Sequence, residues 1–364
     1  MWEGEVDVRD RAAEGGRRST RAQLGGRVGD VSQIASARSI RLQDGAEDGV
    51  RAIDVRVAGG IHALVLVDRG LDIGPAWYAG EPLAWISPTG ITHPTFWASD
   101  SWLRTFYGGL VFTGGLQNIG APNVDDGESH GIHGRIGNLP ARNVVAETVE
   151  DGDRVVVVVR GEVRETSVFG VDLLLRRTLR FPVGEPLVQI HDEVTNLGPA
   201  EAPLLYLYHV NPGYPVLDAG SRLVVPTADV VGADDRSQAA VGEHAEFPPP
   251  SAEFREQMFE HRFDASTPDR VAVGIVNEGY APTGGIGLQV TYDRRQLPRL
   301  WHWRMLGEGR YVTGFEPANA TLKGRAHNRA EGTLPSIAAG ASLSFDLEIR
   351  AATGTALSSL FRER

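Results

Sequence analysis

Residues 342–350, SLSFDLEIR, decide the fold class, because apolar and polar residues alternate along the whole stretch. In an extended chain Leu343, Phe345, Leu347 and Ile349 lie on one side, and the serines and charged residues lie on the other. A period of two predicts an antiparallel strand with one buried face and one face in water.

The same alternation recurs along the chain, at 53–57 and again at 286–292. Val155 to Val159 is continuously apolar, which is typical of a strand covered on both faces. Turns rich in Gly, Pro and Asn separate the runs. Together they predict an all-β protein, a large antiparallel β-sandwich. Further candidate strands lie at 61–67, 155–160, 171–181, 187–195, 203–209, 222–225, 271–276 and 300–305.

Helical periodicity is rare, and the best candidate helix is 251–260, SAEFREQMFE. Ser251 follows three prolines and is a suitable N-cap. The preceding segment, 232–250, has no strand pattern and is interpreted as a loop. We expect one domain over 35–355, a partly flexible or edge-strand segment over 1–34, and a tail over 356–364.

Composition restricts the classes of function. The 364 residues include 36 Lys and Arg and 47 Asp and Glu, and this formal charge of −11 argues against nucleic-acid or membrane partners. The lack of cysteine excludes disulfides and thiolate chemistry, and no apolar run approaches the ~18 residues of a membrane span. Phosphate-loop, GxSxG, HExxH and dinucleotide-binding motifs are missing too. We expect a cytoplasmic monomer or homodimer that acts on a small molecule.

A glycine-rich segment at 127–141, GESHGIHGRIGNLPA, holds Glu128, His130, His133 and Arg135. Its glycines allow the backbone to approach a ligand closely. The first three side chains could ligate a metal, but their spacing matches no helical or zinc-knuckle pattern, and we expect no metal or other cofactor. The alternative is a turn whose histidines bond to the backbone.

A second segment, LLYLYHVNPGYPVLDAG at 204–220, delivers His209 to the end of an apolar strand, just before Asn211. A histidine there can titrate near neutrality and act as an acid. The alternative is a core histidine with one satisfied nitrogen.

Two more segments carry candidate site residues. Glu316 lies between Phe315 and a proline, where burial would raise its pKa and make it a usable base; the alternative is an ion pair with Arg325. In LWHWRM, 300–305, Trp301 and Trp303 share one strand face, with His302 on the other. Tryptophan packs well against sugar rings, although such a pair is more often ordinary core.

In chain order, the segments of His133, His209 and Glu316 resemble the galactose-mutarotase-like superfamily, which includes the aldose 1-epimerases. They are most similar to its uncharacterised bacterial branch known as DUF4432. The resemblance covers roughly residues 35–355 and implies a supersandwich of β-sheets. It assigns sugar binding to His133 in HGRIGN, the general acid to His209 in YHVNPGY, and the general base to Glu316 in GFEPAN.

The implied activity is that of an isomerase, an aldose 1-epimerase or mutarotase. Glu316 removes the proton of the anomeric hydroxyl, His209 protonates the ring oxygen, and the ring opens and closes on its other face. The residues expected to contact the substrate are His133, Arg135, Asn211, Arg69 of DRGLDIG, and Trp303.

Arg135 replaces the aromatic residue that is usual in aldose epimerases, and it could pair with an acidic or phosphorylated sugar. Because a fold does not fix its chemistry, two alternatives remain open. One is another sugar isomerase, epimerase or lyase on the same scaffold. The other is a non-catalytic carbohydrate-binding protein.

Overall fold

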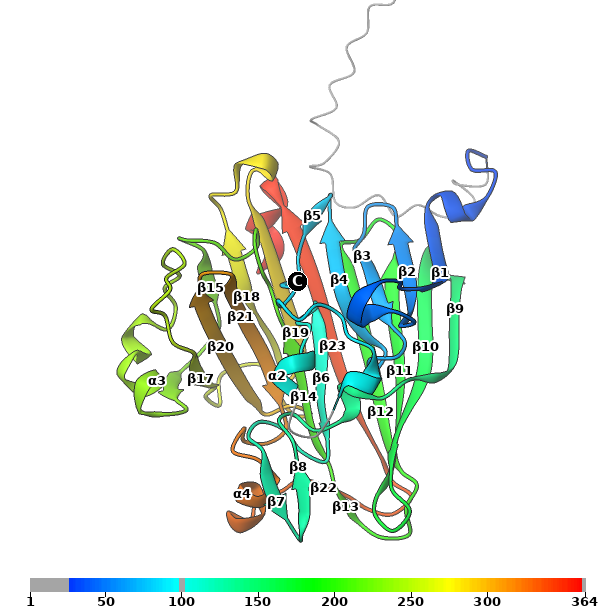
Figure 1. Cartoon of the computed structure of the whole chain (residues 1–364). Helices are drawn as coiled ribbons and strands as arrows, with labels where there is room; N and C mark the ends of the chain where they lie inside the picture. The colour runs from blue at the N-terminus through cyan, green and yellow to red at the C-terminus, as the bar shows by residue number, and fades with distance from the viewer. Residues whose placement is uncertain (1–25, 98–101, 362–364) are drawn as a thin grey trace, which may run out of the picture.

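Two large antiparallel β-sheets pack face to face in the computed structural model, which describes residues 26–97 and 102–361 (Figure 1). The larger sheet has 11 strands. They are β1 (Ala35–Arg41), β2 (Arg51–Val57), β3 (His62–Leu66), β4 (Asp72–Tyr78), β5 (Glu81–Pro82), β6 (Val111–Leu116), β14 (Leu205–Val210), β16 (Asp229–Gly232), β17 (Gln257–Arg262), β20 (Arg299–Gly307) and β21 (Arg310–Ala318). Their order is β1-β2-β3-β4-β6-β14-β21-β20-β17-β16, with β5 paired to β4.

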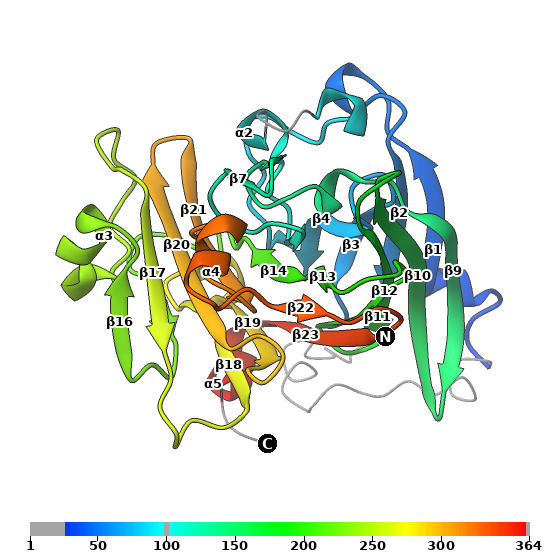
Figure 2. The same cartoon turned by 90° about the horizontal axis from the view of Figure 1, so that it is seen from below.

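The smaller sheet has 8 strands in the order β15-β18-β19-β23-β12-β11-β10-β9. They are β9 (Arg142–Asp151), β10 (Arg154–Thr166), β11 (Asp172–Pro182), β12 (Leu187–Asn196), β15 (Arg222–Val224), β18 (Arg270–Asn277), β19 (Ile286–Asp293) and β23 (Ser342–Thr353). Two short pairs complete the strands: β7 (Asn123–Asp125) with β8 (Glu128–His130), and β13 (Ala202–Pro203) with β22 (Ser336–Ile337). Figure 2 shows β1 and β9, the edge strands of the two sheets, side by side.

Helices are short throughout the described residues. They are α2 (Trp102–Thr105), α3 (Asp235–Ala239), α4 (Arg325–Ala330) and α5 (Leu357–Leu360). Single turns of 3-10 helix occupy Val31–Gln33, Gly45–Glu47, Pro94–Phe96, Ile136–Asn138, Val241–Glu243, Ala281–Thr283 and Gly354–Ala356. Over this part of the chain, no helix has the length and apolar character needed to cross a membrane.

The main apolar core lies between the two sheets, which confirms the predicted all-β sandwich. In β23, Phe345, Leu347 and Ile349 are at most 3% exposed and contribute to that core. Leu343 begins the strand and is 43% exposed, so the alternation holds from the second apolar position onward. In β10 every residue from Val155 to Val159 is buried, as a strand covered on both faces requires.

The helix predicted over 251–260 is wrong. Residues 251–256 form turns, and the rest of the segment begins β17, which pairs with both β16 and β20. Ser251 does accept a bond from a backbone N–H, that of Glu253, but it closes a turn rather than a helix. An isolated helix of ten residues is only marginally stable. Backbone hydrogen bonds from β17 to its two neighbouring strands therefore outweigh the local helix propensity of the segment.

The structure describes part of each predicted terminal segment. Residues 1–25 of the predicted segment 1–34 lie outside the described residues, and residues 26–34 form turns before the edge strand β1. Within the predicted loop 232–250 the chain forms α3 and one turn of 3-10 helix. In the predicted tail, α5 places Leu360 at 4% exposure against Gly287 of β19.

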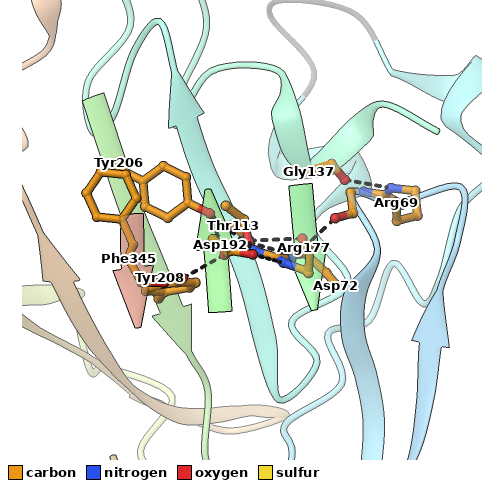
Figure 3. Close-up of polar contacts among 10 residues, drawn as sticks. Arg69, Asp72, Thr113, Gly137, Arg177, Asp192, Tyr206, Tyr208 and Phe345 are labelled. Atoms are coloured by element: carbon orange, nitrogen blue, oxygen red, sulfur yellow. Dashed lines mark hydrogen bonds and ion pairs between the residues drawn. The ribbon is translucent and has the colours of Figure 1, made fainter. Parts of the chain in front are cut away.

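A fully buried ion network joins the two sheets (Figure 3). Arg177 of β11 pairs with Asp72 of β4 and with Asp192 of β12, and all three side chains are 0% exposed. The hydroxyls of Tyr206 and Tyr208 on β14 each donate to Asp192 at 2.6 Å. Because these tyrosines point inward from β14, its alternate residues point to the opposite, outer face of the larger sheet.

Candidate functional site

His209 and Glu316 meet on the outer face of the larger sheet. His209 stands on β14 and Glu316 on the adjacent strand β21, with Nε2 of the imidazole 3.2 Å from Oε1 of the carboxyl group. The two residues are 3% and 0% exposed. Residues 107 positions apart in the sequence are therefore in direct contact, side by side, because the register of these two strands aligns them.

His133 joins the pair from the loop that follows β8. Its backbone has a φ of +53°, a left-handed conformation that non-glycine residues seldom adopt. Its ring lies 5.7 Å from that of His209, centroid to centroid, and its Nδ1 accepts a long bond of 3.4 Å from the backbone N–H of Gly120. One ligand atom from each of His133, His209 and Glu316 lies within 4.8 Å of the others. We call these three residues the His-His-Glu cluster.

Two glycines form the floor under the imidazole rings. A Cβ on Gly114 of β6 would lie 3.3 Å from Nδ1 of His133, and one on Gly314 of β21 would lie 2.9 Å from Cε1 of His209. Each ring therefore packs directly on sheet backbone, and larger residues would displace it.

An aromatic wall, made of Trp102, Phe106 and Trp303, surrounds the cluster. Trp102 lies 5.1 Å from the His133 ring, while Phe106 and Trp303 lie 5.2 and 5.4 Å from the His209 ring. Nε1 of Trp303 donates to Glu256 at 2.7 Å. Trp303, which the sequence suggests as a substrate contact, belongs to this wall, and that role stays a prediction. The sequence gives no signal for Phe106 or Glu256, which come from segments without strand or motif patterns.

Burial controls the protonation of the cluster. It raises the pKa of Glu316 well above 4.5, with Glu256 acting in the same direction. It lowers the pKa of His209 well below 6.5, helped by His133 and opposed by Asn211, and lowers the pKa of His133 to about 4. The raised Glu316 pKa agrees with the sequence prediction, whereas His209 does not titrate near neutrality. A neutral carboxyl group and neutral imidazoles are thus favoured in the closed site.

Among the described residues, neither oxygen of Glu316 has a hydrogen-bond partner, so its contact with His209 has the distance of an ion pair without hydrogen-bond geometry. The alternative partner suggested by the sequence, Arg325, pairs with Asp125 instead, at 2.6 Å. Glu316 is therefore a buried acid without a permanent cation among these residues.

Asn211 and Arg69 lie close to the site, but protein groups occupy their donors. The Asn211 amide donates to the carbonyls of Gly109 and His209, and its Oδ1 has no partner within the part of the chain that the structure describes. The Arg69 guanidinium is 0% exposed, and all three of its nitrogens donate within the protein (Figure 3 includes the bond to Gly137). Its acceptors are the carbonyls of Gly137, Thr92 and Thr105, together with Thr92 Oγ1 and Asn138 Oδ1.

Arg135 lines a different cavity of about 210 Å³, where its guanidinium lies 5.4 Å above the ring of Trp97. Glu128 and His130 line this cavity as well, but no member of the His-His-Glu cluster does. The sequence-derived metal candidates Glu128, His130 and His133 therefore do not form one group. Over the described residues, the group able to hold a metal is the His-His-Glu cluster.

Comparison with known proteins identifies the family and the fold of this chain. The family model named DUF4432, a domain of unknown function, matches residues 47–351. A search of functionally curated proteins gave no match. Among solved structures, a candidate aldose 1-epimerase of Klebsiella pneumoniae superimposes with a TM-score of 0.83 at 23% identity, covering 95% of this chain and 90% of that one.

Two further structures share the fold more distantly. A galactose mutarotase-like protein of Clostridium acetobutylicum has a TM-score of 0.60 at 15% identity, covering 88% of this chain and 99% of that one. The galactose 1-epimerase of Lactobacillus acidophilus has a TM-score of 0.56 at 13% identity, with the same coverages. At such identities the likeness shows the fold, and the match to the family model shows membership: this chain belongs to the DUF4432 family and has the galactose-mutarotase-like fold.

Proposed function

We propose that this protein is a sugar epimerase of the aldose 1-epimerase type, with Glu316 as general base and His209 as general acid. The observation that carries the proposal is the direct contact of these two groups, 3.2 Å apart and buried, on adjacent strands. The hydroxyl oxygen and the ring oxygen of a pyranose are both bonded to the anomeric carbon. A base and an acid placed side by side therefore suit these two neighbouring atoms.

The proposed reaction needs no net change in protons. The Glu316 carboxylate takes the proton of the anomeric hydroxyl, the C1–O bond to the ring oxygen breaks as the carbonyl forms, and the His209 imidazolium protonates the ring oxygen. Rotation about the C1–C2 bond exposes the other face of the carbonyl, and the reverse transfers close the ring. His133 would bind a sugar hydroxyl beside the pair.

In the closed site the favoured forms are the Glu316 carboxylic acid and the His209 imidazole. Together they hold as many protons as the carboxylate and the imidazolium that the reaction needs. Sugar hydroxyls bonded to the Glu316 oxygens would supply hydrogen-bond donors that the described residues do not provide there, and so favour the carboxylate and the imidazolium. Because Glu316 is 0% exposed, a sugar reaches it only when side chains around the cluster shift. Trp102 and Phe106, which lie against the His133 and His209 rings, are among the side chains that surround the cluster.

Exchange spectroscopy by NMR tests the proposal on a panel of aldoses, ketoses, uronates and deoxy sugars, with tag-free protein and a chelator present. We expect accelerated anomeric exchange on at least one sugar and a loss of roughly 10²–10⁴-fold in Glu316→Gln, because each positioned proton-transfer group contributes about that factor. Glu260→Gln is the matched control, since this acid on the same sheet already pairs with Arg299.

Binding without accelerated exchange would contradict the proposal. It would favour a carbohydrate-binding protein, or chemistry at a carbon other than the anomeric one. A uronate preference that disappears in Arg135→Ala would extend the substrate contacts to the Arg135 cavity. Equal binding of neutral and acidic sugars would exclude that role for Arg135.

A further inference from the structure

The His-His-Glu cluster has a property that sugar binding does not require: it combines two imidazoles and a carboxyl group in metal-ligand proximity. The three ligand atoms lie within 4.8 Å of one another. A zinc ion bound at about 2.1 Å in tetrahedral geometry would separate its ligands by about 3.4 Å, so small side-chain rotations suffice. Two histidines and one glutamate are also a donor set that zinc sites with an open fourth position use.

The surroundings of the cluster favour a cation at its centre. Among the described residues, both Glu316 oxygens are buried without a hydrogen bond. Glu256 adds negative charge near Glu316, and Arg325 pairs with Asp125 rather than with Glu316. An uncompensated buried carboxylate is costly, and a divalent ion coordinated by it would remove that cost.

The framework around the three ligands fixes their directions. The His133 and His209 rings pack on the backbone of Gly114 and Gly314, and aromatic rings close around them. With two nitrogen donors and one carboxylate, the set suits first-row ions such as Zn²⁺ or Co²⁺ better than Mg²⁺ or Ca²⁺, which prefer oxygen.

We propose that His133, His209 and Glu316 bind one divalent transition-metal ion of the zinc type, and that this ion and a sugar exclude one another. Both occupants need the His209 imidazole and the Glu316 carboxylate, so a bound ion removes the acid and the base together. The inhibition rests on the proposed function, whereas the metal binding does not.

Direct titration of the chelator-treated, tag-free full chain tests the binding. We expect one Co²⁺ per chain with visible d–d absorption, displaced by Zn²⁺, and a matching one-to-one calorimetric isotherm for Zn²⁺. We expect metal binding to weaken at least ten-fold in each of Glu316→Gln, His209→Gln and His133→Ala. In metal sites generally, replacing a residue that only supports a ligand already lowers the metal affinity by about ten-fold or more. His130→Ala, outside the cluster, should bind as the wild type does.

Near-UV circular dichroism shows which variants are folded, and any one folded ligand variant suffices for the test. Failure of the folded wild type to bind Zn²⁺ or Co²⁺, or unchanged binding in a folded ligand variant, would overturn the site. Loss of metal binding in His130→Ala alone would place the metal in the cavity lined by His130 and Arg135, and would also overturn the proposed site.

Exchange measurements with and without the ion then separate the two proposals. Inhibition by stoichiometric Zn²⁺, reversed by chelator, supports mutual exclusion. Faster exchange with Zn²⁺ would overturn the exclusion and the acid–base roles together, while metal binding would stand. Metal binding in a protein that accelerates no exchange would leave the site intact and remove the proposed function.

Discussion

Gly314 shows how a residue without a side chain fixes the position of one with a function. Its missing Cβ leaves room for the His209 ring, whose Cε1 would otherwise be 2.9 Å away, and the Cβ of Trp303 lies at 3.3 Å. Because the nearest atoms belong to the buried His209 ring and to the first side-chain carbon of Trp303, neither neighbour can move away easily.

We therefore expect Gly314→Ala to displace His209, to slow anomeric exchange at least ten-fold, and to reduce the free energy of unfolding by about 1–3 kcal/mol, the usual cost of overpacking. NMR exchange and urea unfolding measure the two effects. Gly242→Ala is the control, since a Cβ there meets nothing within 4 Å. Wild-type exchange in Gly314→Ala would show that the position of His209 does not matter for the reaction.

His261 provides a second residue-scale prediction, on pH. It is 1% exposed on β17, and burial lowers its pKa to about 3, with His244 adding to the effect. A depressed histidine pKa means that the folded state prefers the neutral ring, so its stabilisation is complete above 6.5 and is lost as pH falls from 6.5 toward 3. Within that window this one group contributes a slope of up to about 1.4 kcal/mol per pH unit.

His261→Gln should therefore be less sensitive to acid than the wild type, with a shallower decline of unfolding free energy between pH 6.5 and pH 4. Urea unfolding at several pH values measures the slope. His191→Gln serves as the control, because that histidine is exposed beside Asp346. Equal slopes in the wild type and His261→Gln would mean that His261 is not held neutral by the fold.

At the scale of elements, Arg69 connects separate segments beside the site. From the turn between β3 and β4 it donates to Thr92, to Thr105 of α2 and to Asn138, while its guanidinium lies 4.9 Å above the ring of Tyr107. The segment from 92 to 107 carries Trp102 and Phe106 of the aromatic wall. Arg69 therefore supports the wall, and its contacts favour this role over substrate binding.

Replacing Arg69 by Met should lower the free energy of unfolding by about 3–5 kcal/mol, because several buried carbonyls lose their donor at about 1–3 kcal/mol each. Thermal unfolding measures this, and Arg69→Lys should not restore the loss, since one ammonium group cannot reach acceptors on three segments. Normal stability together with weakened sugar binding would instead identify Arg69 as a substrate contact.

The elements also show where prediction from the sequence succeeds. The period of two identified β19 and β23, because one face of each strand is buried against the second sheet. It failed for β17, where three prolines and Ser251 suggested a helix start and only pairing with β16 and β20 decides the structure. The contact between His209 and Glu316 depends on the register of β14 and β21, which no local pattern encodes. The proposed roles of these residues remain predictions.

At the scale of the whole molecule, the two sheets depend on a polar junction that no motif in the sequence marks. In the run LLLRRTLRF, 173–181, Arg177 shares the apolar strand face of Leu175 and Leu179, and its charge is fully buried between Asp72 and Asp192. Tyr206 and Tyr208 donate to Asp192 from β14, the strand that carries His209 on its opposite face. The junction thus attaches the site-bearing strand to the smaller sheet.

Arg177→Met should reduce the free energy of unfolding by about 3–5 kcal/mol, because it leaves two buried carboxylates without their cation. Adding Asp72→Asn and Asp192→Asn to Arg177→Met removes the unpaired charges, so the triple variant should be more stable than the single variant. Relative to the wild type its free energy of unfolding has no fixed sign, because replacement of a whole buried ion group stabilises some proteins and destabilises others. Urea unfolding of the single and triple variants measures both steps. A loss below about 1 kcal/mol in Arg177→Met would mean that the buried carboxylates are already protonated in the folded protein, since only neutral groups tolerate removal of their cation so well.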